Sequence, residues 1–164
     1  MILWFQAGLY GFAQTTWYVA VSGSDTNSGQ TASEAFATTN HAIDVATCGD
    51  SILILKGSYE EKISAYRICP ADNRIVIQGD PQERPVITGD RNATNKYAIG
   101  VTGQGFVFRH LALTSPFPNE CDPSNMVVVG RGDHFLFDDI WVYGSGYDGI
   151  KTVHNCEEND FPTG

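Results

Sequence analysis

Asp148 and Lys151 are the residues whose types and spacing first suggest chemistry. They lie in GSGYDGIKTV, residues 144–153, where a glycine-rich turn leads into a short β-like run. If Ile150 points into a core, Lys151 points outward with Asp148 at the start of the strand. A base next to a carboxylate can remove a proton or hold a cation. The alternative is an exposed ion pair at the rim of a structural repeat.

Other carboxylates and aromatics extend this candidate site. Asp122 precedes the equivalent strand at 126–129 and is a weaker third member. The adjacent pair Asp138–Asp139 could share Ca²⁺, but Asp139 is better explained as a corner residue, because Asp tolerates left-handed backbone. Trp141 and Tyr143 alternate with apolar residues, so we expect them to face outward, where they could stack on sugar rings or lie under the loop 115–125.

An internal repeat indicates the elements that hold these residues. The segments 97–114 and 126–143 match without a gap at an offset of 29 residues. A period of this length with short alternating strands predicts a β-solenoid with at least three strands per coil. A further shift by 29 would place Phe106 over Ile77. A β-sandwich is the alternative, but the hairpin turns that it needs are mostly absent. The residues predicted to lie inside are Phe106, Phe108, Leu111, Leu113, Phe135, Phe137, Ile140 and Val142.

The N-terminal part has a different organisation. Residues 17–21 predict a strand, which is followed by a polar loop, a helix over 36–47 and a buried strand from Ser51. The abundance of glycines and aromatics among 164 residues indicates one mostly β domain over 17–164.

The stretch 17–63 carries a resemblance to a known family. Its Tyr-Val strand, Gly-x-Asp-x-Asn-x-Gly loop, helix, Gly-Asp-x-Ile and Lys-Gly-x-Tyr resemble the N-terminal module of pectate-lyase-like proteins. Ala35 departs from the pattern, because the family usually has proline before the following Phe. The resemblance implies a right-handed parallel β-helix with an N-terminal capping helix. The coils are few for this family, so we expect the chain to be truncated at its C-terminal end.

The resemblance implies a function only coarsely, because lyases, hydrolases, epimerases and non-catalytic surface proteins share this fold. We expect a polysaccharide lyase acting by β-elimination on an acidic glycan such as pectate or alginate. Lys151 would then be the catalytic base with Asp148 beside it, Asp148 and Asp122 would bind Ca²⁺, and Trp141, Tyr143 and Asp122 would contact the polysaccharide. The alternative is a non-catalytic glycan-binding or cell-surface protein.

Several features predict secretion. Residues 1–16 are apolar and fit a signal segment, although a buried strand is the alternative. The four cysteines allow three pairings, of which sequence order favours Cys48–Cys69 and Cys121–Cys156. Asn92 begins a glycosylation sequon.

Charge and hydropathy restrict the partners. The net charge of −9 and the lack of a basic cluster argue against nucleic-acid binding. No segment is long and apolar enough to span a membrane. We expect a secreted monomer.

Overall fold

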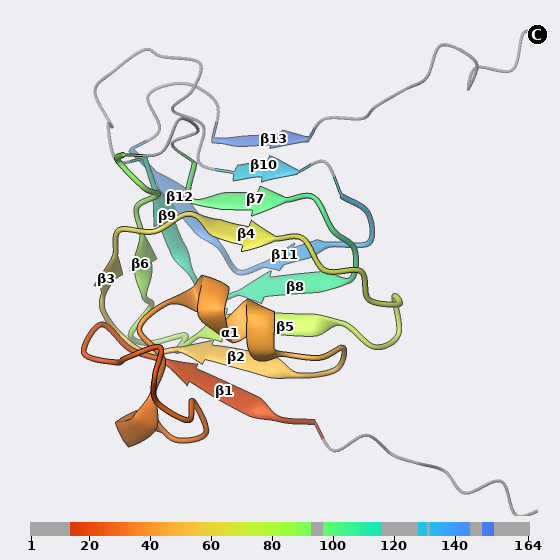
Figure 1. Ribbon diagram of the computed structural model, residues 1–164. Helices are drawn as coiled ribbons and strands as arrows, with labels where there is room; N and C mark the ends of the chain where they lie inside the picture. The colour runs from red at the N-terminus through yellow and green to blue at the C-terminus, as the bar shows by residue number, and fades with distance from the viewer. Residues whose placement is uncertain (1–13, 93–96, 116–127, 131, 145–148, 153–164) are drawn as a thin grey trace, which may run out of the picture.

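The computed structural model describes residues 14–92, 97–115, 128–130, 132–144 and 149–152. These residues form short strands and a single α-helix (Figure 1). The elements in chain order are β1 (Thr16–Val19), the 3₁₀ turn η1 (Ala32–Glu34), α1 (Thr39–Val45), β2 (Ser51–Ile54), β3 (Ser58–Tyr59), β4 (Ile63–Ala65), β5 (Ile75–Gly79), β6 (Val86–Ile87), β7 (Ile99–Val101), β8 (Phe106–Arg109), β9 (Ala112–Thr114), β10 (Val128–Gly130), β11 (Leu136–Asp138), β12 (Trp141–Tyr143) and β13 (Ile150–Thr152).

Successive coils build three parallel sheets in the described part of the chain. Their strand orders are β1-β2-β5-β8-β11, β13-β10-β7-β4 and β12-β9-β6-β3. Each turn of the chain adds one strand to each sheet, so the strands inside each sheet pair with strands from the turns before and after them (Figure 1). This arrangement of short parallel strands is consistent with a β-helix and confirms the prediction of three strands per coil.

The register confirms the 29-residue repeat and corrects its extension. Phe108 pairs with Phe137, and Leu113 pairs with Val142, both at the predicted offset. One coil earlier, however, Phe106 pairs with Ile75 and not with Ile77, an offset of 31. The two coils differ because residues 80–85 connect β5 to β6, whereas only two residues connect β8 to β9.

Inward-facing side chains of neighbouring coils form the core. Of the residues predicted to lie inside, Phe106, Phe108, Leu111 and Leu113 are fully buried. Their equivalents Phe135, Phe137, Ile140 and Val142 pack against this core but are only partly buried. The reason is that they belong to or flank β11 and β12, the last strands of their sheets in the described chain. The Phe108 and Phe137 rings stack with centroids 5.1 Å apart.

Left-handed residues turn the chain between sheets. His110 and its repeat equivalent Asp139 have φ of 55° and 52°. This conformation is uncommon outside glycine, but His and Asp are enriched in it. The bend explains how Phe108 and Leu111 can both be buried despite their odd spacing. It confirms the interpretation of Asp139 as a corner residue.

The helix is shorter than predicted. It spans Thr39–Val45, within the predicted range 36–47, and Thr38 is its N-cap. Phe36 cannot belong to the helix because its backbone pairs with β1: its N–H donates to Tyr18, and its carbonyl accepts from Ala20. The apolar residues Ala42 and Ile43 are buried, as the pattern predicted.

The helix also closes part of a sheet edge. β4 is the end strand of its sheet, so its outer backbone groups lack a neighbouring strand. Asn40 supplies this partner: its amide nitrogen donates to the Lys62 carbonyl, and its amide oxygen accepts from the Ser64 N–H, both at 2.8 Å. The Asn40 side chain therefore provides the donor and the acceptor that a neighbouring strand would otherwise provide. That α1 is the terminal cap of a solenoid stays a prediction.

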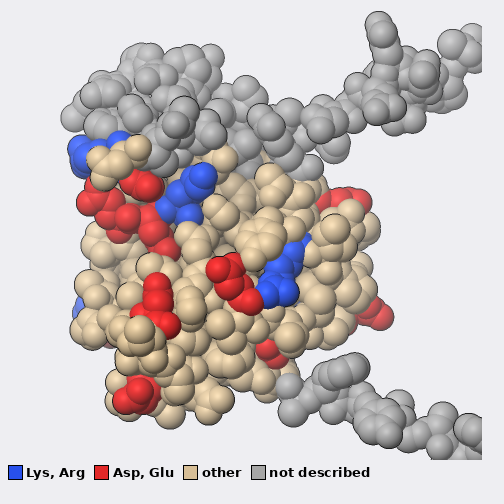
Figure 2. Space-filling view, in the orientation of Figure 1, with Lys and Arg blue, Asp and Glu red and all other residues tan. Residues whose placement is uncertain are grey.

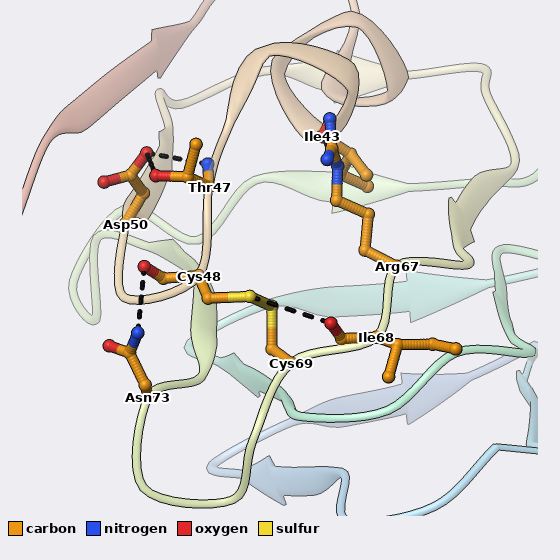
Figure 3. The surroundings of a disulfide bond; sticks show 8 residues. All are labelled: Ile43, Thr47, Cys48, Asp50, Arg67, Ile68, Cys69 and Asn73. Atoms are coloured by element: carbon orange, nitrogen blue, oxygen red, sulfur yellow. Dashed lines mark hydrogen bonds between the residues drawn. A yellow bond between two sulfur atoms is a disulfide. The ribbon is translucent and has the colours of Figure 1, made fainter.

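A disulfide fastens the end of the helix to the next coil. Cys48 and Cys69 are bonded, with their Cα atoms 5.5 Å apart, as sequence order predicted (Figure 3). Close by, the Arg67 guanidinium donates to the Ile43 carbonyl at 2.8 Å. Cys121 and Cys156 lie outside the described residues, so their pairing stays a prediction.

The carboxylate of Asp50 joins three parts of the N-terminal module. It accepts hydrogen bonds from the backbone and hydroxyl of Thr47, the Thr15 backbone and the Trp17 indole, at 2.9–3.1 Å. Burial by itself raises the pKa of Asp50, but the hydrogen bonds from Thr47, Thr15 and Trp17 outweigh it and lower the pKa. Asp50 is thus an ionised anchor under the first coil.

Replacing Asp50 with alanine should destabilise the protein by about 1–3 kcal/mol, because the hydrogen-bond donors of Thr15, Trp17 and Thr47 lose their shared, buried acceptor. The control is Asp80→Ala, which removes an exposed carboxylate that accepts from only two backbone N–H groups. Because the folded pKa of Asp50 is lowered, its stabilisation is complete above its unfolded pKa of about 3.9 and is lost as the pH falls through the folded value. Urea unfolding at pH 7 and pH 3 measures both effects. Equal losses in the two variants at pH 7 would contradict the anchoring role.

Removing the first disulfide should also lower the free energy of unfolding. For this 21-residue separation, Cys48→Ala/Cys69→Ala should cost on the order of 3 kcal/mol. Urea unfolding with and without reductant measures this cost, and the difference between the variant and the wild type should shrink when reductant opens the bond. Wild-type protein that binds a thiol reagent at Cys48 without prior reduction would contradict the bond.

Candidate functional site

Trp141 and Tyr143 lie on the outer face of β12. They are 58% and 49% exposed and flank the partly buried Val142, which confirms that they face outward. The strand below offers only small side chains at these positions, because Trp141 pairs with Ala112 and Tyr143 with Thr114. Large rings above small residues leave a hollow of about 420 Å³. We call it the aromatic groove, and its lining residues are Lys56, Gln82, Glu83, Arg84, Val86, Ala112, Trp141 and Tyr143.

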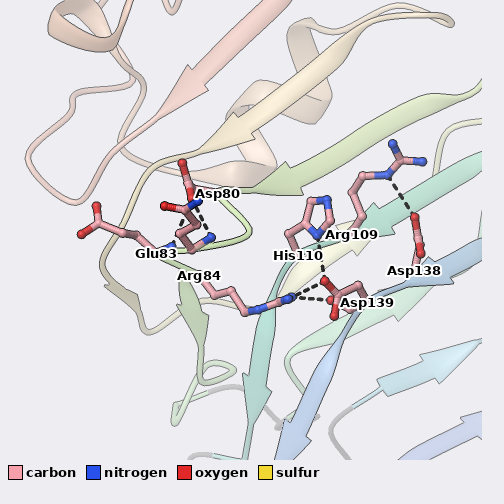
Figure 4. A network of polar contacts seen from close by, with 8 residues as sticks. Asp80, Glu83, Arg84, Arg109, His110, Asp138 and Asp139 are labelled. Atoms are coloured by element: carbon pink, nitrogen blue, oxygen red, sulfur yellow. Dashed lines mark hydrogen bonds and ion pairs between the residues drawn. The ribbon is translucent and has the colours of Figure 1, made fainter.

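Arg84 connects this groove to the corner beside it (Figure 4). Its guanidinium donates to the carboxylate and to the backbone carbonyl of Asp139, 55 positions later in the chain. The guanidinium carbon lies 4.5 Å from the centre of the Trp141 ring, a cation–π contact. The Arg84 side chain is only 9% exposed, so these contacts fix its position.

Both carboxylates of the Asp138–Asp139 pair are occupied by cationic or polar partners. The hydrogen bond from Arg84 is the main reason that the pKa of Asp139 is lowered, and His110 contributes through a contact of 3.1 Å. Asp138 pairs with Arg109 at 3.6 Å. The two carboxylates therefore neutralise cations of neighbouring coils, as expected of corner residues.

Lys151 lies on a different sheet from the aromatic pair. β13 pairs with β10, which places Ile150 next to Val128 and Lys151 next to Val129. Ile150, which we expected to point into a core, has a side chain that is 51% exposed, because β13 is the end strand of its sheet among the described residues. Asp148 and Asp122 lie outside the described residues. The structure thus does not bring Trp141 and Tyr143 onto the sheet that holds Lys151.

An aromatic ring that sequence reasoning missed lies on the outer side of this second sheet. Tyr97 covers Gly100, which aligns with Val129 and is two strands from Lys151. A side-chain carbon at Gly100 would be 2.5 Å from the Tyr97 ring, so glycine is needed there. Lys62 lies over the same ring at 5.3 Å. The position of Tyr97 before the strand, instead of within it, concealed this contact from pattern analysis.

Two further carboxylates, Asp25 and Glu61, hold the start of α1. Asp25 accepts from the backbone of Ala37 and Thr38, and Glu61 accepts from the backbone and hydroxyl of Thr39. Burial raises the pKa of Glu61, although the hydrogen bonds from Thr39 partly oppose it. Their oxygens are used structurally.

Two predicted features remain, the glycosylation site at Asn92 and the calcium site, and the structure describes only the first. Asn92 is exposed in a turn, where its N–H donates to Asp90 at 2.8 Å, and its glycosylation stays a prediction. Within the described ranges, no group of three or more His, Cys, Asp or Glu side chains is arranged to hold a metal ion. The predicted Ca²⁺ ligands Asp148 and Asp122 fall outside those ranges, so calcium binding stays a prediction.

On the face that carries α1, the charged side chains of the described residues are spread out (Figure 2). Figure 2 shows the face with α1 as mostly uncharged, with acidic and basic side chains interspersed and no broad basic patch among its described residues. The described residues contain no helix with the length and apolar character needed to cross a bilayer.

The stacked coils with three parallel sheets define a pectate-lyase-like β-helix architecture, and comparison with solved structures supports this. Pectate lyase Pel9A superimposes with a TM-score of 0.60 at 18% identity, covering 77% of this chain and 33% of that one. A GH136 lacto-N-biosidase from Eubacterium ramulus gives 0.57 at 15% identity, covering 88% and 31%. A rhamnogalacturonan lyase gives 0.53 at 16%, covering 77% and 36%. These likenesses show the fold.

Sequence comparison adds one relative. No family model matches the chain. The uncharacterized protein YwoF of Bacillus subtilis (strain 168) is 26% identical over 145 residues, which cover 83% of this chain and 29% of that protein. The chain therefore spans about a third of the length of the proteins that it resembles.

The contact between Arg84 and Asp139 should be visible in the titration of the carboxyl group. Arg84→Ala should return the pKa of Asp139 toward its ordinary value, because the largest cause of the lowering is removed. Carboxyl carbon NMR titration measures this pKa directly. Lys56→Ala is the control, since Lys56 lines the same groove but pairs with Glu83. An unchanged Asp139 titration in Arg84→Ala would refute the assignment.

Proposed function

We propose that this chain is part of a secreted carbohydrate-active protein, most specifically a polysaccharide lyase that acts on an acidic glycan. The observation that carries the proposal is the coil stack itself, which superimposes on a pectate lyase and a rhamnogalacturonan lyase. The proposal includes a closed right-handed β-helix whose N-terminal end is capped by α1. The Cys48–Cys69 disulfide fits an oxidising, extracellular setting.

The proposed chemistry is β-elimination at a uronate residue. A base removes the proton next to the sugar carboxylate, the electron pair forms a carbon–carbon double bond, and the glycosidic C–O bond breaks, with the leaving oxygen taking a proton from water. A neutral lysine amine could accept this proton, and Lys151 lies on a strand that continues the sheet of β7 and β10. Asp148 and Asp122 would hold Ca²⁺ near the substrate carboxylate, where the cation would stabilise the charge that develops.

Tyr97 supports a polysaccharide path along this sheet. Its ring lies over Gly100, in the same register column as Lys151. Aromatic rings on a sheet face offer flat apolar surface to the C–H faces of a sugar. A glycan lying across β7, β10 and β13 could therefore contact Tyr97 and reach Lys151.

A non-catalytic glycan-binding protein is the second candidate. It is favoured by the aromatic groove, whose cations are already paired with carboxylates and whose rings remain exposed. Such a site can bind sugar without any reacting group.

The lyase proposal predicts an unsaturated product. The protein containing this chain should release it from polygalacturonate, rhamnogalacturonan or alginate, measured by ultraviolet absorbance with added CaCl₂ and with a chelator. Lys151→Ala should lower the rate by about 10²-fold or more, because the base is lost, while the melting temperature stays nearly unchanged. Arg91→Ala is the charge-matched control, since it removes a cation that pairs at the surface with Glu60. Full activity of Lys151→Ala would exclude this base, and an inactive wild type would favour the non-catalytic alternative.

A further inference from the structure

We propose that the aromatic groove is a second carbohydrate-binding site, separate from the sheet of Lys151, and that it binds a neutral glycan. The groove lies on the outer face of the sheet β12-β9-β6-β3, whereas Lys151 belongs to β13-β10-β7-β4. A sugar chain bound along one of these sheets would therefore not extend along the other. The inference does not depend on lyase activity.

The arrangement of the two rings suits a sugar chain. Trp141 and Tyr143 are two residues apart on one strand, so their side chains leave the same face about 7 Å from each other. The floor beneath them consists of Ala112 and Val86, which are small enough to leave room for a ligand. Apolar rings over a shallow floor with polar groups at the margin are typical of a small-molecule site.

Trp141 is held in place before any ligand arrives. Arg84 lies against its ring at 4.5 Å and is itself fixed by two hydrogen bonds to Asp139. The indole nevertheless remains 58% exposed, so it still offers surface for contact. A ring that is already immobilised loses less side-chain entropy when it binds, and this favours recognition.

The charges of the groove indicate a neutral ligand. Arg84 is engaged with Asp139, and Lys56 pairs with Glu83 at 2.7 Å. Each of these cations is therefore matched by a carboxylate. Binding a uronate would require a cation free to pair with its carboxylate, or the loss of one of these ion pairs. A neutral pyranose needs only the ring surfaces and neutral hydrogen-bonding groups such as Gln82.

Binding of defined oligosaccharides tests the inference. The probes are cellohexaose, xylohexaose and trigalacturonate, titrated by calorimetry into the protein containing this chain. We expect one of the neutral probes to bind, and Trp141→Ala and Tyr143→Ala each to weaken it by about tenfold or more. Tyr66→Ala is the matched control, because Tyr66 is also half exposed but lies at the end of β4, where its hydroxyl donates to Asp44. Circular dichroism verifies that each variant folds.

The outcomes separate this site from the lyase proposal. Lys151→Ala should retain binding of the neutral probe, and Trp141→Ala should retain binding of trigalacturonate and its cleavage. The inference is overturned if neither neutral probe binds wild-type protein, or if Trp141→Ala binds it equally well. It is also overturned if Trp141→Ala loses trigalacturonate instead, which would make the groove part of the acidic-glycan site. Concentration-dependent dimers that Trp141→Ala abolishes would assign the groove to a second copy of the chain.

Discussion

Backbone hydrogen bonding between successive coils is the interaction on which the rest of this structure depends. In a stack of parallel strands, each coil completes the N–H and C=O groups of its neighbours, and an unpaired buried group costs about 1–3 kcal/mol. Among the described residues no earlier strand lies beside β4, and the Asn40 amide of α1 takes that place. The position of the helix therefore follows from the needs of the sheet. Phe36 limits the helix from the other side, because its backbone N–H and C=O groups are hydrogen-bonded to Tyr18 and Ala20 and are not available to α1.

The same stacking determines where polar side chains are needed. In the two later coils, left-handed backbone at His110 and Asp139 allows the apolar residues on both sides of the corner to face the core. The corner residues His110 and Asp139 belong to adjacent coils, whose strands lie about 4.8 Å apart, and the Asp139 carboxylate needs a partner there. Asp139 finds two, His110 from the coil before and Arg84 from the connection before β6. Because Arg84 also contacts Trp141, a requirement of the corner positions a ring on the neighbouring sheet.

The two faces of the stack differ in chemistry. On the sheet of β7 and β10, Tyr97 and Lys62 lie near the column that ends in Lys151. On the sheet of β9 and β12, the cations are already paired and the aromatic rings are exposed. Because successive strands of each coil belong to different sheets, the two sites that we propose, one for an acidic glycan and one for a neutral glycan, lie on separate faces of one fold.

Sequence alone determined the features that repeat or are local. The offset of 29 residues placed Phe108 against Phe137, the alternation around Val142 placed Trp141 and Tyr143 outside, and cysteine order gave Cys48–Cys69. Tertiary structure decided what depends on connections of unequal length. Coils of unequal length shifted the register of β5 by two residues, and the segment 80–85 carried Arg84 to Asp139, a contact across 55 positions that no periodicity encodes. The tertiary structure also separated Trp141 and Tyr143 from Lys151. The sequence shows which face of a strand is polar, whereas only the folded coil determines to which sheet that strand belongs.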